Sequence, residues 1–430
     1  MHSENDSKSV FFTMKKTIYA LQLLCASVLL AFTAIACTSD EETFEEVSSN
    51  EPQDFGNVTV SVTNYPTGEN KIASTRSASS DSTVVNLTAT CVKMLSNNHA
   101  IVSYHGRNGA LTGMLQIVKY NDDNSFQVVS ELNTQDARVN TVETNGDRHI
   151  FVGFDARDTH NAASGVAQLD LNDAYQFEAN MTSLTPTGLN GRSINNIIYQ
   201  PQWAKLWVTT STYQAATDIK AGLVKFDLKN GAFKIIHNWT NKSLRGHWID
   251  FSENQAAFLY TAEPKTYNSL GWRKPVIRFY SQVLPESSQW SLYADAAARV
   301  PYSVDQEVKS KNSCRIYRGS GDTKIFVCTD SMVVYNYADS AMTQAAVVSK
   351  ATHYVDFNGN TAYAAHGTAG VFKYKVNDDG TLQRLGKYKS NVMTADTTET
   401  SANFCLYSNG KLFVAYGYAG LVILGDADFK

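Results

Sequence analysis

The chain has 430 residues, a formal net charge of −4 and no basic stripe, which argues against binding to nucleic acid. With 22 tyrosines, 20 phenylalanines and only 8 prolines, its composition is typical of an exported all-β protein. An acidic stretch that begins at Asp40 supplies more than the whole net charge, so the remaining chain is near neutral or slightly basic.

Residues 1–36 are predicted to form a signal peptide, with the true start at Met14. Two lysines follow Met14, then an apolar run over residues 18–32, then small residues up to Ala36. This order of basic, apolar and small residues is that of an export signal. The apolar run is too short for a comfortable transmembrane helix.

The residues around Cys37 resemble a bacterial lipobox, with Ala34 and Ala36 directly before the cysteine. The resemblance implies cleavage before Cys37, acylation of this residue and attachment to the membrane through lipid, since several acyl chains together anchor stably. The sequence departs from the pattern at Ala34, where leucine is commoner. The alternative is an ordinary secretory signal followed by a chance cysteine.

Residues 37–80 are predicted to form a disordered acidic tether, because seven carboxylates there have no lysine or arginine between them. The run of Ser39, Asp40, Glu41 and Glu42 resembles the export signal of surface lipoproteins in Gram-negative anaerobes. The resemblance implies a lipoprotein of the cell outer membrane that faces outward. The alternative is a protein that faces the periplasm.

Residues 81–430 are predicted to form a seven-bladed β-propeller, because one four-strand pattern recurs with a period near 45 residues. Alternating apolar residues predict strands with one buried face, and Asn-Gly pairs predict tight turns. The second strands are expected at 99–104, 149–154, 205–209, 257–260, 324–328, 361–365 and 411–416. The third strands are expected at 114–120, 165–170, 222–227, 276–280, 332–336, 370–374 and 420–424.

The last two units resemble the repeats of LVIVD-type and YVTN-type propellers. The residues that carry this resemblance are Ala-Ala-His-Gly-Thr-Ala-Gly-Val-Phe at 364–372 and Ala-Tyr-Gly-Tyr-Ala-Gly-Leu-Val-Ile at 415–423. The resemblance implies the propeller fold and says little about activity, because propellers serve many unrelated functions.

The seventh unit stops after its third strand, so its closing strand must come from elsewhere in the chain. Residues 82–89 are predicted to supply it, because closure removes an edge that invites aggregation. Residues 57–62 are the alternative donor.

Two cysteines, Cys314 and Cys328, flank a predicted hairpin that turns at Ser320 and Gly321. If the hairpin folds about Gly321, the two cysteines lie opposite one another, and an exported protein could form a cross-strand disulfide there. Two buried free thiols are an equally good interpretation.

A binding face is predicted where the loops between second and third strands are long, at 105–113, 155–164, 211–221 and 263–274. Long loops on a rigid scaffold are the usual place for binding residues. Trp248 and Trp272, expected to be exposed, would suit stacking against sugars. The candidate binding residues are His105, Arg107, Asp155, Arg157, His160, Tyr213, Arg245, His247, Trp248, Trp272 and His366.

The sequence favours a module that binds an envelope protein or a glycan, with no cofactor and no metal site assigned. None of the common nucleophile, zinc, phosphate or dinucleotide patterns occurs, so no catalytic residue is assigned. One alternative is a lactonase-like hydrolase, which would need histidine, glutamate and arginine in the central channel. Another is a purely structural subunit of an envelope complex.

Overall fold

A computed structural model describes the propeller and the strand that precedes it. The described residues are 57–66, 87–106, 111–155, 165–189, 193–211, 221–231, 233–241, 244–262, 275–283, 296–300, 312–319, 322–391 and 400–430. Within these ranges the chain is all β, apart from three short 3₁₀ turns, η1 (Pro201–Trp203), η2 (Lys229–Gly231) and η3 (Asp426–Asp428). No helix in the described part is long and apolar enough to cross a bilayer.

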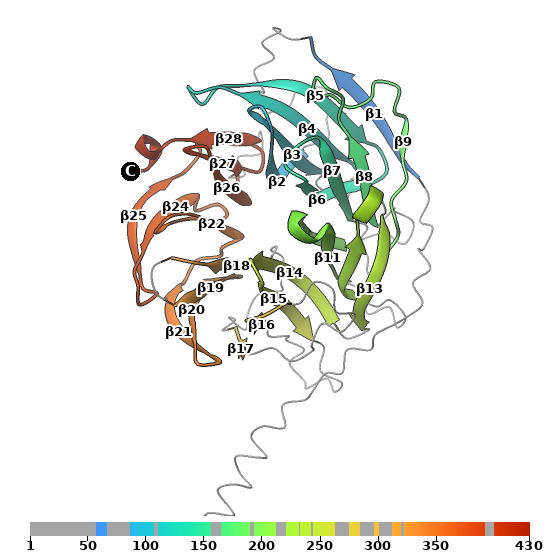
Figure 1. Cartoon of the computed structure of the whole chain (residues 1–430). Coiled ribbons are helices and arrows are strands. Elements are labelled where there is room, and N and C mark those ends of the chain that lie inside the picture. Colours follow the sequence, from blue (N-terminus) through green and yellow to red (C-terminus); the bar gives the residue numbers. More distant parts are fainter. Residues whose placement is uncertain are drawn as a thin grey trace, which may run out of the picture. The chain divides into compact units, whose positions relative to one another are not determined.

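Antiparallel strands are arranged as seven blades around a centre, with the first strand of each blade innermost (Figure 1). The predicted all-β, seven-bladed propeller is therefore confirmed. Blade one contains β2 (Leu87–Leu95), β3 (His99–Gly106), β4 (Gly113–Tyr120) and β5 (Phe126–Thr134). Blade two contains β6 (Arg138–Thr144), β7 (His149–Asp155) and β8 (Gly165–Asp170).

The remaining blades follow in chain order. Blade three contains β10 (Ser193–Gln200), β11 (Lys205–Ser211), β12 (Ala221–Asp227) and β13 (Lys234–Asn241). Blade four contains β14 (Leu244–Ser252), β15 (Gln255–Ala262), β16 (Val276–Tyr280) and β17 (Ala296–Arg299). Blade five contains β18 (Ser313–Tyr317), β19 (Thr323–Cys328), β20 (Met332–Ala338) and β21 (Ala341–Val348).

Blade six contains β22 (Tyr354–Asn358), β23 (Thr361–Ala365), β24 (Val371–Val376) and β25 (Leu382–Tyr388). Blade seven contains β26 (Phe404–Ser408), β27 (Lys411–Ala415) and β28 (Leu421–Leu424). The second and third strands overlap the ranges predicted from the sequence in every blade. The Asn-Gly signals also hold, since Asn409 and Gly410 both adopt positive φ (51° and 77°) in the tight turn between β26 and β27.

Asparagine side chains link the innermost strands of neighbouring blades. Asn140 and Asn195 sit where a bulge interrupts the first strand of blades two and three. Their side-chain amides donate to the backbone carbonyls of Ile194 (2.7 Å) and Gly246 (2.6 Å) in the next blade. A bulge leaves one residue out of the ladder, so its side chain is available to contact the neighbouring blade.

Blade seven has three strands among the described residues, β26, β27 and β28. Of the predicted closing strand 82–89, residues 82–86 lie outside the described part. Residues 87–89 belong to β2 and pair with β3, so they do not extend blade seven. Contacts between blades one and seven include an isolated bridge between Ala89 and Gly417.

The alternative donor, residues 57–62, does form a strand, but this strand does not pair with blade seven. β1 (Val58–Asn64) pairs with β5 of blade one and with the short strand β9 (Ser183–Leu184), not with β28. It falls within the range 37–80 that the sequence assigned to the disordered tether, and this assignment is wrong for the seven residues of β1. Alternating burial explains the strand, since Val58 and Val60 enter the core while Thr59 and Ser61 are exposed.

The hairpin of β18 and β19 has a register one residue away from the expected one. Cys328 lies opposite Ser313, and Cys314 lies opposite Val327. Because successive side chains of a strand point to opposite faces, the two cysteines enter different hydrophobic clusters. Both are free buried thiols, so the disulfide interpretation is corrected in favour of the alternative.

Candidate functional site

Three aromatic side chains meet at the centre of the ring. Trp248 of blade four contacts Tyr354 of blade six and Phe404 of blade seven, at ring-centroid distances of 5.3 and 6.4 Å. Tyr354 and Phe404 stack at 4.0 Å. Blades four, six and seven are not all neighbours, so these contacts cross the centre. The exposed fraction of each of the three residues is 4% or less, and the centre is filled here.

A second layer at the centre is an ion network held by Arg315 of blade five. Its Nε lies 3.3 Å from Oδ2 of Asp250 in blade four, and its Nη1 lies 3.0 Å from Oδ1 of Asp356 in blade six. The guanidinium also donates to the hydroxyl of Tyr354. One arginine thus joins three consecutive blades.

Each of the two aspartates makes a second contact with the next blade. Oδ2 of Asp250 accepts from the backbone N–H of Ile316 at 2.8 Å, and Oδ2 of Asp356 accepts from that of Tyr407 at 2.7 Å. Burial raises the pKa of Asp250, although Arg315 opposes the shift by stabilising the charged form. Both carboxylates therefore serve contacts within the protein.

Lys93 of blade one pairs with Glu143 of blade two. The distance from Nζ to Oε2 is 2.7 Å, and Nζ lies 5.8 Å from the ring centroid of Phe404. Burial alone would lower the pKa of Lys93, but the adjacent Glu143 carboxylate outweighs burial, and the pKa is raised. Lys93 and Glu143 therefore form an ion pair, which stabilises the charged form of the lysine.

The predicted binding residues with described side chains lie mostly in the interior. Nε2 of His247 contacts Oγ1 of Thr261 at 2.6 Å, and burial lowers the pKa of this histidine to about 3. Burial likewise lowers the pKa of His366 to about 4, and its ring contacts Thr352 (2.9 Å) and Tyr374 (3.0 Å). These histidines support the packing of their own blades.

The expectation that Trp248 is exposed is wrong, because it fills the centre of the ring and leaves no face for a sugar. His105 is half-buried near the end of β3, and Arg245 is half-buried in β14. The backbone of Asp155 ends β7 opposite Arg138 and also pairs with Ser193 of blade three.

The other predicted residues, and most of the long loops that define the predicted binding face, lie outside the described residues. They are Arg107, Arg157, His160, Tyr213 and Trp272.

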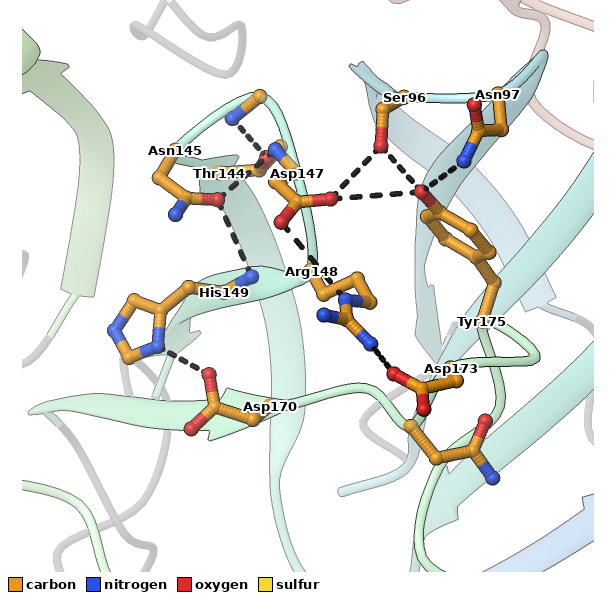
Figure 2. Close-up of polar contacts among 12 residues, drawn as sticks. Ser96, Asn97, Thr144, Asn145, Asp147, Arg148, His149, Asp170, Asp173 and Tyr175 are labelled. Atoms are coloured by element: carbon orange, nitrogen blue, oxygen red, sulfur yellow. Dashed lines mark hydrogen bonds and ion pairs between the residues drawn. The ribbon is translucent and has the colours of Figure 1, made fainter.

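One face of the ring carries the short turns between the first and second strands of each blade, and contacts between blades hold this short-turn face together. Figure 2 shows the turn of Ser96 and Asn97 in blade one meeting Asp147 and Tyr175 of blade two. Oγ of Ser96 donates to Oδ1 of Asp147 at 2.8 Å, and Nδ2 of Asn97 donates to the hydroxyl of Tyr175 at 2.9 Å. The Tyr175 ring stacks on His99 with the centroids 4.1 Å apart. The polar groups of this turn are therefore used to join two blades.

Similar contacts recur around the same face. Asn409 of blade seven donates to the hydroxyl of Tyr120 in blade one at 2.9 Å, and Lys373 of blade six lies 2.9 Å from Asp426, which follows blade seven. Nδ2 of Asn336 in blade five donates to the carbonyl of Asp379 in blade six at 2.8 Å. Contacts on the short-turn face therefore help to hold the ring together.

The central network was not predicted from the sequence, although a signal for it exists. Asp250, Arg315 and Asp356 each stand between two apolar residues in the first strand of a blade. A charge in that setting must find a partner, because an isolated buried charge is costly. A comparison of the first strands of neighbouring blades shows that these charges alternate in sign from one blade to the next, which would have predicted the ion pairs.

The buried thiols of the described part are not activated as nucleophiles. Burial raises the pKa of the Cys328 thiol to about 12 and raises the pKa of the Cys405 thiol well above its ordinary value, which makes both poor nucleophiles. Among the described residues, no group of three histidine, cysteine, aspartate or glutamate side chains could hold a metal ion.

No family model matches the chain, and no curated protein matches it. A solved structure of the computationally designed Ika8 protein is 10% identical and has a TM-score of 0.42, covering 79% of this chain and 96% of its own. Chaetomium thermophilum Sqt1, solved bound to the N-terminus of ribosomal protein L10, is 9% identical and has a TM-score of 0.49, covering 79% of this chain and 97% of its own.

Proposed function

We propose that this chain is an outer-membrane lipoprotein, anchored through acylated Cys37 and facing outward, whose propeller binds an envelope protein or a glycan. The binding surface is the face with the long loops between second and third strands. The anchoring part is supported by the residues around Cys37 and by the acidic run that follows. The binding part is supported by how the other surfaces of the ring are used.

The observation that carries the binding proposal is the filled centre. Trp248, Tyr354 and Phe404 occupy it, and the adjacent Arg315 forms ion pairs with Asp250 and Asp356. The short-turn face holds the blades together through contacts such as that of Ser96 with Asp147. These two regions serve the fold, which favours the long-loop face for recognition, in line with the usual place of binding residues on rigid scaffolds.

A test of the binding face can use the two ends of a single strand. Thr368 is exposed in the loop after β23 on the long-loop face, and Asn360 is exposed in the turn before β23 on the opposite face. A photo-reactive residue at Thr368 should crosslink to an envelope protein or to glycan in intact cells, and the same residue at Asn360 should not. Crosslinks from Asn360 alone would contradict the proposal.

Anchoring is tested separately by labelling cells with a palmitate analogue. The label should be lost in Cys37→Ala and kept in Cys25→Ala, because only Cys37 follows the small residues of the cleavage site. Surface exposure is tested by protease treatment of intact cells. Full protection of the protein behind an intact outer membrane would overturn the outward orientation.

A further inference from the structure

β1 lies along the outer rims of two neighbouring blades. Residues from Val60 to Asn64 pair antiparallel with residues 130–134 of β5 in blade one. Val58 and Thr59 pair with β9, which follows blade two in the chain. Figure 1 shows β1 between β5 and β9. The first described strand therefore joins β5 of blade one to β9 in one continuous sheet.

Side chains fix the N-terminal end of β1. The backbone N–H and the hydroxyl of Thr59 both donate to the carboxylate of Asp136, each at 3.0 Å. The N–H of Gln135 donates back to the carbonyl of Thr59 at 3.2 Å. Val58 beside them is fully buried. This end is thus held by hydrogen bonds and by the core at once.

The C-terminal end of β1 is fixed in a similar way. Nδ2 of Asn64 donates to the carbonyl of Phe177 at 3.0 Å, and the hydroxyl of Ser130 donates to Oδ1 of Asn64 at 2.5 Å. The next residue, Tyr65, donates from its hydroxyl to Oε2 of Glu131 at 2.7 Å. Both ends of the strand are therefore attached to the propeller by side chains as well as by the ladder.

The direction of β1 sets how it would respond to a pull. β5 runs from the short turn at 121–125 to the connection at 135–137, which lies on the long-loop face. Because β1 is antiparallel to β5, Val58 lies at the long-loop end and Asn64 at the short-turn end. The chain that leads back to Cys37 therefore joins the propeller at the long-loop rim of blades one and two.

We infer that β1 is the attachment through which tension on the tether reaches the propeller, and that it carries this tension in shear. The inference rests on the proposed anchoring of Cys37. Antiparallel ladder bonds are perpendicular to the strands. A pull along β1 toward Cys37 loads all of them together, whereas a pull across the strand end breaks them one after another. The propeller can then be pulled by a bound partner while its blades stay closed.

The experiment compares two pulling directions on unlipidated full-length chain carrying Cys25→Ser, with Cys37 as the first handle. For shear, the second handle is Asp122→Cys, in the turn before β5. For peeling, it is Gln135→Cys, next to Thr59 at the long-loop end. Both positions are exposed, whereas Cys91, Cys314, Cys328 and Cys405 are buried. The first rupture should need a clearly higher force in the shear direction, and equal forces would overturn the inference.

A matched pair of variants tests the contacts at the strand end. Asp136→Ala removes two hydrogen bonds to Thr59 and should shorten the lifetime of the shear-loaded state by about tenfold. Asp122→Ala is the control, because the Asp122 side chain has no described contact with β1. In this variant the second handle is moved to Asn121→Cys. The lifetime should be the same as that of the chain with this handle and Asp122 unchanged. An unchanged lifetime in Asp136→Ala would count against this role of the strand end. Because no lipid is present, these results do not depend on whether Cys37 is acylated in cells.

Discussion

The side-chain amide of Asn403 in blade seven donates to the backbone carbonyl of Ala89 in blade one, at 2.8 Å and across 314 positions of sequence. The same type of contact joins Asn140 to Ile194 and Asn195 to Gly246. The last and first blades are therefore joined by the same asparagine-to-carbonyl hydrogen bond as blades that follow one another in the chain. Closure of the ring is supported by side chains as well as by the bridge at Gly417.

Replacing Asn403 by alanine should lower the free energy of unfolding by about 1–3 kcal/mol, because the carbonyl of fully buried Ala89 would lose its donor. Asn133→Ala in β5 is the control, since its half-buried side chain has no described hydrogen bond, and its effect should stay within about 0.5 kcal/mol. Urea denaturation measures both. Equal effects would show that the contact does not stabilise the junction.

Arg315→Met should be among the most damaging single changes, because it leaves the carboxylates of Asp250 and Asp356 buried without their cation. The expected loss in the free energy of unfolding is about 3–5 kcal/mol. Arg318→Met removes a more exposed pair with Glu253 and should cost about 1 kcal/mol or less. Chemical denaturation distinguishes the two, and a small effect at Arg315 would mean that the network contributes little to stability.

Trp248→Ala should lower the free energy of unfolding, because the side chain fills the centre of the ring. A loss of about 3–5 kcal/mol is expected for a buried tryptophan. Trp203→Ala provides the comparison, since Trp203 is half-buried in a turn and contacts Phe251 only edge-on. Thermal and urea unfolding measure both changes. A Trp248→Ala protein as stable as the parent would contradict the packing described for the centre.

Val60→Ala should lower the free energy of unfolding by about 1–3 kcal/mol, because it removes two buried methyl groups from β1. Ser61→Ala changes the exposed neighbour and should stay within about 0.5 kcal/mol. If both variants unfold like the parent, β1 does not belong to the cooperative unit of the propeller. Urea denaturation followed by tryptophan fluorescence is a suitable measurement.

Acid should destabilise the fold partly through His247 and His366, whose pKa values are lowered to about 3 and about 4 by burial. An unfolded histidine has a pKa near 6.5. Between about pH 6.5 and about pH 4 the unfolded state binds more protons, so the free energy of unfolding falls as the pH falls, by up to about 1.4 kcal/mol per pH unit for each histidine.

His366→Gln isolates one of these contributions, because glutamine does not titrate. The variant should lose less stability than the parent between about pH 7 and about pH 5, whatever its stability at neutral pH. The comparison needs urea midpoints at several pH values within that range. An identical slope in the two proteins would show that His366 has the same pKa in the folded state as in the unfolded state.

The fold was predictable because each strand carries its own signal. Alternation at residues 411–416 and the Asn-Gly pair at 409–410 depend only on neighbours in sequence, and β27 (Lys411–Ala415) follows them closely. The register of β18 and β19 was less predictable, because a shift of one residue leaves the alternation intact but moves Cys328 opposite Ser313.

The centre of the ring was not predictable by inspecting one blade at a time. Trp248 looks like a candidate for a surface site when it is read with its neighbours Arg245 and His247. Its burial depends on Tyr354 and Phe404, which reach it from other blades. β1 was hard to assign for the same reason, since its partners in β5 and β9 lie far along the chain.

Because the same asparagine contact joins the blades at the closing junction and at internal junctions, the ring does not require the chain ends to lie at one particular junction. Since Asn403 joins Ala89 as Asn195 joins Gly246, neither junction depends on peptide continuity alone. Loop positions without buried backbone are where circular permutation is tolerated. A permuted chain that begins at blade three and ends with blade two should therefore close into the same ring, provided that β1 is kept beside β5.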